Sequence, residues 1–195
     1  MNKSRLVKIS KYLSYHLRHH PDKLGLQLAP GGWIAVDTLL TACQRDKFSL
    51  TAPELAAVVA ENDKKRFSFD STGKLIRANQ GHSIEVDLQL EPMEPPAILY
   101  HGTQEDAVQS ILKQGLSKMS RHHVHLSTDL ETAKNVGKRH GKPVIFVVAA
   151  GKMDRDGYTF YCSENQVWLV EKVPPAYLTL DKGLATIRKD LSDYY

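Results

Sequence analysis

The chain has 195 residues, of which 42% are hydrophobic, 25% charged and 8% aromatic. These proportions exclude a disordered, collagen-like or disulfide-stapled chain and predict a globular protein with one domain or two small ones. The formal net charge of +4 at pH 7 is too small to predict a partner by itself.

The amino-terminal segment predicts a basic helix. Five basic residues precede Asp22, the first acidic residue of the chain. They are Lys3, Arg5, Lys8, Lys11 and Arg18. Apolar residues recur at helical spacing over 6–17, and Pro21 disfavours helical geometry at the preceding residue, so we expect the helix to end near Arg18 and His19. Such a helix favours a polyanion such as nucleic acid, and a solvated basic helix explains the charges equally well.

The elements that follow are short. We predict a helix over residues 36–42, a second helix through Ala60 with Thr51 as its N-cap, and a β-hairpin with strands over 66–69 and 74–77. Three short helices followed by a hairpin is the element order of a winged-helix module, which binds nucleic acid in some proteins and only protein in others.

A proline-rich segment separates the two halves of the chain. Residues 90–96 hold three of the nine prolines and predict a linker. We therefore expect a lobe over residues 1–90, a linker over 91–97, a second lobe over 98–180 and a tail over 181–195. Residues 1–90 hold 13 basic and 9 acidic side chains, whereas residues 91–195 hold 13 of each, so the positive surplus lies in the first lobe.

The second half is richer in strands. We predict strands over 98–100, 124–126, 144–148, 166–170 and 177–180. Between them lie predicted helices over 105–113, closed by Gly115, and over 129–139, started by a Ser or Thr cap. Residues 181–195 are polar enough to be a loose helix or a tail. The fold class expected for the whole chain is α+β.

Two short motifs place a histidine two residues before a hydroxyl, His101-Gly102-Thr103 and His125-Leu126-Ser127. Residues two apart in a strand point the same way, so each pair can face one cleft and act on a phosphate or a ribose. For a single pair, a hydrogen-bonded structural histidine is the simpler interpretation. Two pairs, with a glycine that permits close approach of the backbone, favour a functional one.

Cationic residues form a second set, Arg18-His19, Lys64-Lys65-Arg66 and Arg121-His122-His123. Guanidinium groups match phosphate oxygens, so arginines that converge from separate elements would form an anion clamp, although scattered surface arginines are commoner. The histidines lack the spacing and the carboxylate of a zinc site, and we expect no metal.

Cys43 and Cys162 are too few for a disulfide framework, which favours a reducing compartment. The amino terminus lacks the apolar stretch of a signal peptide, and the longest apolar run, residues 144–150, is far shorter than a membrane helix. We expect a cytoplasmic protein without a membrane segment.

Six motifs in order resemble the RNA 2'-phosphotransferases of the Tpt1/KptA family. They are Leu17-Arg18-His19 with Pro21, Asn62-Asp63 before Lys64-Lys65-Arg66-Phe67, Gln80-Gly81-His82-Ser83, His101-Gly102-Thr103, Arg121 with Val124-His125-Leu126-Ser127, and Asn165 with Val167-Trp168-Leu169. Each motif is weak alone, but six in order are specific. The resemblance implies an N-terminal winged-helix-like RNA-binding lobe and a C-terminal ADP-ribosyltransferase-like, β-rich lobe that binds NAD.

The resemblance also implies a reaction. The enzyme would remove an internal 2'-phosphate from RNA in two steps through an ADP-ribosylated 2'-phosphate, giving 2'-OH RNA, nicotinamide and ADP-ribose 1'',2''-cyclic phosphate. NAD would be consumed as a co-substrate. The partners implied are therefore NAD and an RNA with an internal 2'-phosphate, such as a tRNA, and we expect a monomer.

The resemblance assigns the residues to roles. It implies a catalytic, phosphate-handling quartet of Arg18, His19, Arg66 and Arg121, and an NAD-binding set of His101, Gly102, Thr103, His125, Ser127 and Val167. We add Lys64, His82 and Ser83 as expected contacts of RNA or phosphate.

One residue departs from the family pattern. Gln166 stands where the family usually has a glycine, which costs about 1 kcal/mol or more if the position has a positive φ, unless the loop is rearranged.

Two other functions remain open. A two-histidine phosphoesterase would act on cyclic phosphates without NAD, but it leaves the arginines unexplained. A noncatalytic winged-helix protein would explain the first 90 residues and nothing after them.

Overall fold

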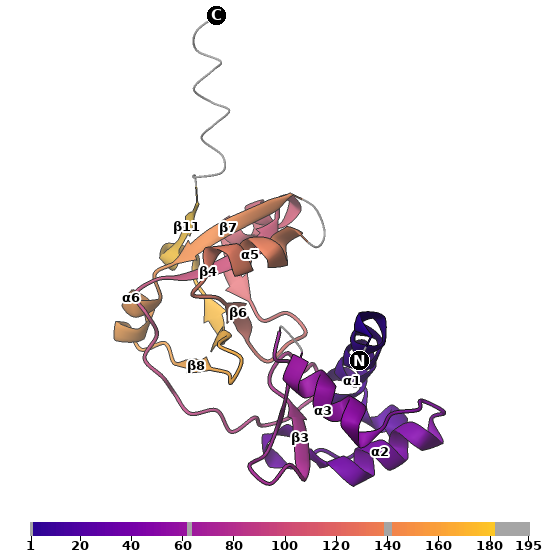
Figure 1. The fold of residues 1–195 in the computed structure, drawn as a ribbon. Helices are drawn as coiled ribbons and strands as arrows, with labels where there is room; N and C mark the ends of the chain where they lie inside the picture. Colours follow the sequence, from indigo (N-terminus) through magenta and orange to yellow (C-terminus); the bar gives the residue numbers. More distant parts are fainter. Residues whose placement is uncertain (1, 62–63, 139–141, 182–195) are drawn as a thin grey trace, which may run out of the picture. The chain divides into compact units, whose positions relative to one another are not determined.

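The computed structural model describes residues 2–61, 64–138 and 142–181 (Figure 1). The chain divides into two compact units. The first comprises Met1–Glu91 with Ser120–His122 and Ser163–Asn165, and the second comprises Pro92–Met119, His123–Cys162 and Gln166–Tyr195. Arg121 therefore belongs to the first unit, although it lies in the second half of the sequence.

The first unit consists of three α-helices and a small antiparallel sheet. The helices are α1 (Lys3–His19), α2 (Val36–Arg45) and α3 (Ala52–Glu61), with short 3-10 helices at Pro21–Leu24 and Pro30–Gly32. The strands β1 (Trp33–Ala35), β2 (Phe67–Phe69) and β3 (Leu75–Ala78) form a sheet in the order β1-β3-β2. The predicted helices and the hairpin of this half are thus confirmed.

Helix α1 packs an apolar stripe into the core of this unit. Ile9, Leu13 and Leu17 are fully buried at helical spacing. The Asn2 side chain caps the amino terminus by accepting from the Ser4 N–H at 2.7 Å. The helix ends at His19 because the chain turns into Pro21, as predicted.

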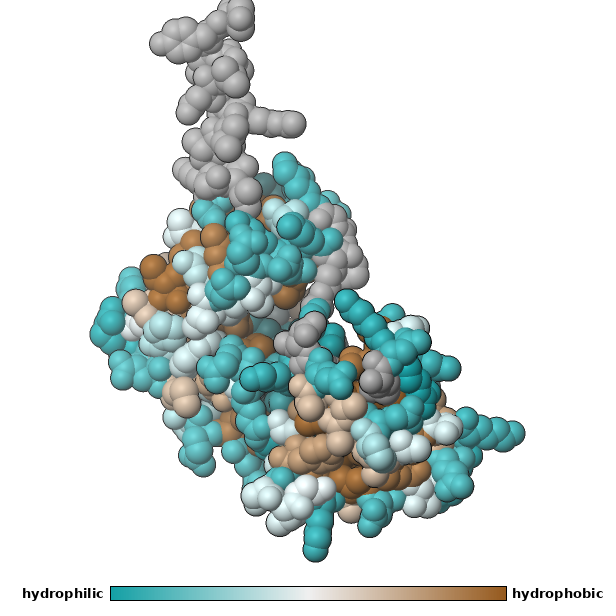
Figure 2. All heavy atoms as spheres, viewed as in Figure 1, coloured by the Kyte–Doolittle hydropathy of each residue, from teal (hydrophilic) through white to brown (hydrophobic). Residues whose placement is uncertain are grey.

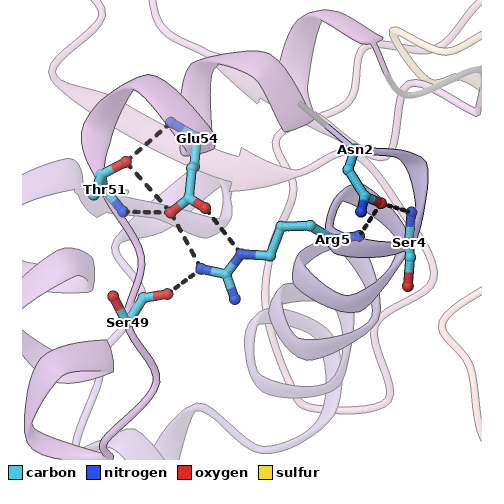
Figure 3. A network of polar contacts seen from close by, with 6 residues as sticks. All are labelled: Asn2, Ser4, Arg5, Ser49, Thr51 and Glu54. Atoms are coloured by element: carbon cyan, nitrogen blue, oxygen red, sulfur yellow. Dashed lines mark hydrogen bonds and ion pairs between the residues drawn. The ribbon is translucent and has the colours of Figure 1, made fainter.

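A polar network fastens the start of α3 to α1 (Figure 3). Thr51 and Glu54 form a capping box, in which the Thr51 N–H donates to the Glu54 carboxylate at 3.0 Å. Arg5 donates to both carboxylate oxygens of Glu54, from Nε at 2.9 Å and from Nη2 at 3.1 Å, and also to the Ser49 carbonyl. The Arg5 hydrogen bond lowers the pKa of Glu54 to about 2. Arg5, one of the five basic residues of the predicted basic helix, is thus paired with an acid.

The second unit contains eight strands and three α-helices among its described residues. The strands are β4 (Leu99–Gln104), β5 (Leu116–Ser117), β6 (Val124–Leu126), β7 (Pro143–Val148), β8 (Phe160–Cys162), β9 (Trp168–Val170), β10 (Lys172–Val173) and β11 (Leu178–Leu180). The helices are α4 (Val108–Gln114), α5 (Leu130–Gly137) and α6 (Ala150–Arg155), with 3-10 helices at Glu105–Ala107 and Pro175–Tyr177. All strand pairs are antiparallel, in the orders β11-β7-β4, β6-β9-β8 and β10-β5.

Each unit has its own core, which supports the α+β class predicted for the chain. The second core is built around Leu99, Phe146, Met153 and Phe160, each at most 1% exposed. The visible face of the protein is largely hydrophilic, interrupted by areas of hydrophobic residues (Figure 2). None of the helices in the described ranges has the length and apolar character needed to cross a bilayer.

Some details of the second half differ from the prediction. The cap of α5 is Asp129, whose carboxylate accepts from the Thr132 N–H at 2.7 Å, so the expected Ser or Thr cap is wrong. Asp129 is better suited, because a carboxylate also interacts favourably with the helix dipole. Helix α6 and strands β1, β5, β8 and β10 were not predicted; β5 and β10, with two residues each, are too short to show a period. Residue 139 and the tail over 182–195 lie outside the described residues.

Gln166 adopts the left-handed conformation that the family glycine would favour, with a φ of 61°. We therefore expect Gln166→Gly to raise the free energy of unfolding by about 1 kcal/mol, measured by urea denaturation. Gly73→Ala, which introduces a side chain at a φ of 71° with no heavy atom within 4 Å of the new Cβ, should lower it by a similar amount. An unchanged stability in Gln166→Gly would mean that the loop carries no strain.

Candidate functional site

Arg18 and His19 lie at the carboxyl end of α1, where Ser83 fastens both residues. The Ser83 N–H donates to the Arg18 carbonyl at 3.0 Å. The Ser83 hydroxyl lies 2.8 Å from His19 Nδ1, within hydrogen-bonding distance. Ser83 therefore holds the helix end through its backbone and orients the His19 ring through its side chain, which directs Nε2 away from Ser83.

Arg66 is held next to this helix end by two hydrogen bonds to its carbonyl. The Asn79 N–H donates to it at 2.9 Å, and Arg18 Nη2 lies 3.4 Å from it. The Asn79 side chain also donates to the Lys65 carbonyl at 2.8 Å. Lys65 has a φ of 39°, an uncommon value for a residue with a side chain. Asn79 thus holds a strained backbone at the position that presents Arg66.

The guanidinium groups of Arg66 and Arg121 lie close enough to Arg18 for their charges to repel that of Arg18. Burial, with smaller contributions from the positive charges of Arg66 and Arg121, lowers the pKa of Arg18 to about 10. Arg18 is still cationic at neutral pH. Because like charges gathered in one place are unfavourable, their proximity indicates a site for an anion.

His19 lies in the same positive environment. Burial, followed by the charges of Arg18, His20 and Arg121, lowers the pKa of His19 below its usual value. The imidazole is therefore neutral at pH 7. A phosphate dianion bound beside it would act in the opposite direction, because a nearby negative charge favours the protonated ring. His19 can then donate a hydrogen bond from Nε2 to a phosphate oxygen.

His82 is buried behind this cluster, with 1% of its surface exposed. Burial, with smaller contributions from the charges of Arg18, His122, His19 and Arg77, lowers its pKa to about 3. Neither ring nitrogen has a hydrogen-bond partner in the protein. We expected His82 to contact RNA or phosphate, but its burial favours a supporting place behind the exposed Ser83.

Lys64, the other expected contact, lies on an exposed turn. The Asn165 side chain donates to its carbonyl at 3.0 Å, which fixes the backbone of this turn within the first unit. Lys64 precedes Arg66 by two residues, so both cationic side chains come from the same short stretch of chain.

In the second unit, the two histidine motifs lie side by side. His101 Nδ1 lies 3.0 Å from the carbonyl oxygen of His125. Tyr100 and Ser127 exchange two backbone hydrogen bonds, at 2.8 and 2.9 Å, which join β4 to the end of β6. A carbonyl oxygen only accepts, so Nδ1 of His101 holds the proton and the lone pair is on Nε2. His101 Nε2 can therefore accept a hydrogen bond from a ribose hydroxyl.

Gly102 serves close packing between β4 and α5. A Cβ atom added there would lie 1.8 Å from the Ala133 carbonyl oxygen. At Gly137, on the same helix, an added Cβ would lie 2.7 Å from the Thr103 carbonyl oxygen. Two positions without side chains therefore let the helix and the strand approach closely. On the strand itself, His101 and Thr103 share the face opposite to Gly102.

Ser127 and Val167 lie next to the histidine pair. Ser127 accepts from the Asp129 N–H at 3.0 Å and so contacts the cap of α5. Val167 directly precedes Trp168, whose partner in the neighbouring strand is Leu126. The six residues expected to bind NAD thus gather around β4, β6 and the start of β9.

The predicted residues therefore form two clusters, each within one unit. The quartet of Arg18, His19, Arg66 and Arg121 lies in the first unit, and the six residues around His101 lie in the second. Asn79 was missed by the sequence analysis, because nothing local marks an asparagine as a backbone anchor. In the described part of the chain, no three His, Cys, Asp or Glu side chains are grouped so that they would hold a metal ion.

Comparison with known proteins supports a single family. The model of the family described as "RNA 2'-phosphotransferase, Tpt1 / KptA family" matches residues 4–172. A Nostoc punctiforme protein named "Probable RNA 2'-phosphotransferase" is 66% identical over 91% of this chain and 98% of its own. Proteins of the same name are 51% identical in Herpetosiphon aurantiacus, over 93% of this chain and 100% of theirs, and 52% identical in Burkholderia pseudomallei, over 88% and 94%.

Proposed function

The chain belongs to the Tpt1/KptA family of RNA 2'-phosphotransferases, and we propose that it removes an internal 2'-phosphate from RNA by transferring it to NAD. The observation that supports this most directly is the convergence of three arginines and His19 in the first unit. Such a group matches the charge and shape of a phosphate dianion.

The proposed chemistry has two steps. The RNA 2'-phosphate first attacks C1'' of the nicotinamide ribose of NAD, and nicotinamide leaves. The ribose O2'' then attacks the phosphorus, loses its proton and displaces the RNA 2'-oxygen, which takes up a proton. The products are 2'-OH RNA and ADP-ribose 1'',2''-cyclic phosphate.

The residues of the first unit act on the phosphate. Arg18, Arg66 and Arg121 neutralise the charge that spreads over its oxygens during the second step. His19 donates a hydrogen bond to the phosphate and, once protonated in its presence, supplies the proton to the departing 2'-oxygen. Lys64 adds positive charge at the edge of this site.

The residues of the second unit fit the nicotinamide-side ribose. His101, whose proton is on Nδ1, accepts from a ribose hydroxyl through Nε2, and Thr103 lies on the same face of β4. His125, Ser127 and Val167 complete the set proposed to position this ribose. Gly102 contributes by allowing α5 to pack closely against β4. A valine at 167 offers no carboxylate, which suits a phosphate that is already a competent nucleophile.

The same proposal assigns one substrate to each lobe. The first unit would be a winged-helix-like RNA-binding lobe and the second an ADP-ribosyltransferase-like NAD-binding lobe. The boundaries at residues 90 and 98, the monomeric state and the cytoplasmic location remain predictions.

The test is to incubate the protein with NAD and an RNA that has one internal 2'-phosphate. We expect release of nicotinamide, one equivalent per phosphate removed, and 2'-hydroxyl RNA. Phosphate removal without NAD would favour a phosphoesterase instead. Binding of the RNA without turnover would favour a noncatalytic protein.

Ser83→Ala tests how His19 is positioned. Loss of the hydroxyl frees the imidazole, so we expect kcat to fall about tenfold with little change in the KM for NAD. Ser83→Thr keeps a hydroxyl and should restore most of the rate. Equal rates in Ser83→Ala and the unaltered enzyme, over the pH range 6–8, would contradict a positioning role.

A further inference from the structure

An exposed aromatic ring lies one helical turn from His19. Tyr15 precedes His19 by four residues on α1, so the two side chains are neighbours on one face of the helix, with Cβ atoms roughly 5–6 Å apart. Tyr15 is 42% exposed and lies near the carboxyl end of α1.

Polar and cationic groups surround the ring without burying it. The His20 ring lies 4.6 Å away between centroids, at an angle of 42°. Lys23 Nζ donates to the Tyr15 hydroxyl at 2.5 Å, and this hydrogen bond raises the pKa of Lys23. The hydroxyl is held at one edge, so the orientation of the ring is fixed while part of its surface stays open to solvent.

The chemistry of this group matches single-stranded RNA. An aromatic ring beside positive charge is the usual platform for an unstacked base, since every base has a face that stacks and a phosphate that the charge attracts. An RNA bound as a single strand through its 2'-phosphate has unstacked bases beside that phosphate. The neighbouring base then needs a new partner, and Tyr15 lies next to the phosphate site.

We propose that Tyr15, with His20 and Lys23, is a stacking site for the base of the nucleotide that flanks the 2'-phosphate. The base stacks on the exposed part of the Tyr15 ring, and Lys23 lies near the adjoining phosphodiester. Stacking of this kind tolerates any base, so the site recognises a single strand with a flanking nucleotide and not a sequence. The inference rests on the proposed function, because it uses the position of the 2'-phosphate.

The test uses a short RNA with one internal 2'-phosphate and 2-aminopurine as the flanking base. Without NAD, binding to the unaltered protein should quench the fluorescence, and Tyr15→Ala should abolish most of this quenching. With NAD, Tyr15→Ala should raise the KM for the RNA about tenfold and change kcat less than twofold. Tyr15→Phe keeps the ring and loses only the hydrogen bond to Lys23, so it should stay much closer to the unaltered protein than Tyr15→Ala in both measurements.

Val7→Ala is the matched control, because Val7 is 43% exposed on the same helix. A second control is a 2'-phosphorylated nucleoside with no neighbour, for which Tyr15→Ala should leave the KM unchanged. An unchanged KM for the RNA in Tyr15→Ala would overturn the proposal, and so would an equal loss on the nucleoside. Failure of the unaltered protein to remove the phosphate would instead contradict the proposed function, while the fluorescence still tests stacking.

Discussion

Arg66→Ala should convert the enzyme into one that accumulates ADP-ribosylated RNA. In the first step the phosphate acts as the nucleophile, and its own negative charge already favours this attack. The second step places new charge on the phosphate oxygens while the RNA oxygen leaves, so it depends more on the guanidinium groups. We expect the second step to slow about 10²–10³-fold and the first step much less.

Arg66→Ala leaves the backbone contacts of residue 66 in place. The carbonyl oxygen of residue 66 accepts from Arg18 and from the Asn79 N–H, and alanine keeps both of these contacts. Arg121→Ala should give the same intermediate, because Arg121 acts on the same cluster. Arg66→Lys keeps the positive charge without the planar fork, so its second step should be faster than in Arg66→Ala and slower than in the unaltered enzyme.

The measurement is a single-turnover time course that separates substrate, ADP-ribosylated RNA and product by electrophoresis. Arg45→Ala is the control, since Arg45 is an exposed arginine in the last turn of α2, outside both clusters. If neither Arg66→Ala nor Arg121→Ala slowed either step, the phosphate-handling role of these arginines would be wrong.

Local signals predicted the ends of the elements in the first unit. Pro21 stops α1, and Thr51 with Glu54 starts α3, because a cap or a proline acts within one turn of the helix. The hairpin was equally visible, since its turn residues lie between two alternating runs. These features need no information from distant parts of the chain.

Tertiary contacts set the limits of the sequence analysis. The proline-rich linker placed Arg121 in the second lobe, over residues 98–180, whereas the structure groups it with Arg18 and Arg66. Asn79 donates to the carbonyls of Lys65 and Arg66, and Ser83 donates to the carbonyl of Arg18. No spacing pattern in the sequence predicts such hydrogen bonds. The candidate residues were thus found by type and motif, while their supports became visible only in the fold.

Gly102→Ala should unfold or displace part of the second unit, whatever the role of this residue toward NAD. The new methyl group would overlap the carbonyl oxygen of Ala133, which belongs to the backbone of α5 and cannot rotate away. The helix must therefore move off β4, and its packing at Gly137 would open as well. We expect the free energy of unfolding to fall by about 3 kcal/mol.

Hydrogen exchange with urea denaturation would measure this effect and locate it. Protection should be lost in α5 and β4 and retained in α1, because the two units have separate cores. Gly73→Ala, with open space around its Cβ, should cost only about 1 kcal/mol, from its positive φ. A Gly102→Ala protein as stable as this control would contradict the close packing. If the large loss is observed, low activity in Gly102→Ala reports the displaced helix, and contact with NAD is tested instead by substitutions at the other residues of the set, such as His101 or Thr103.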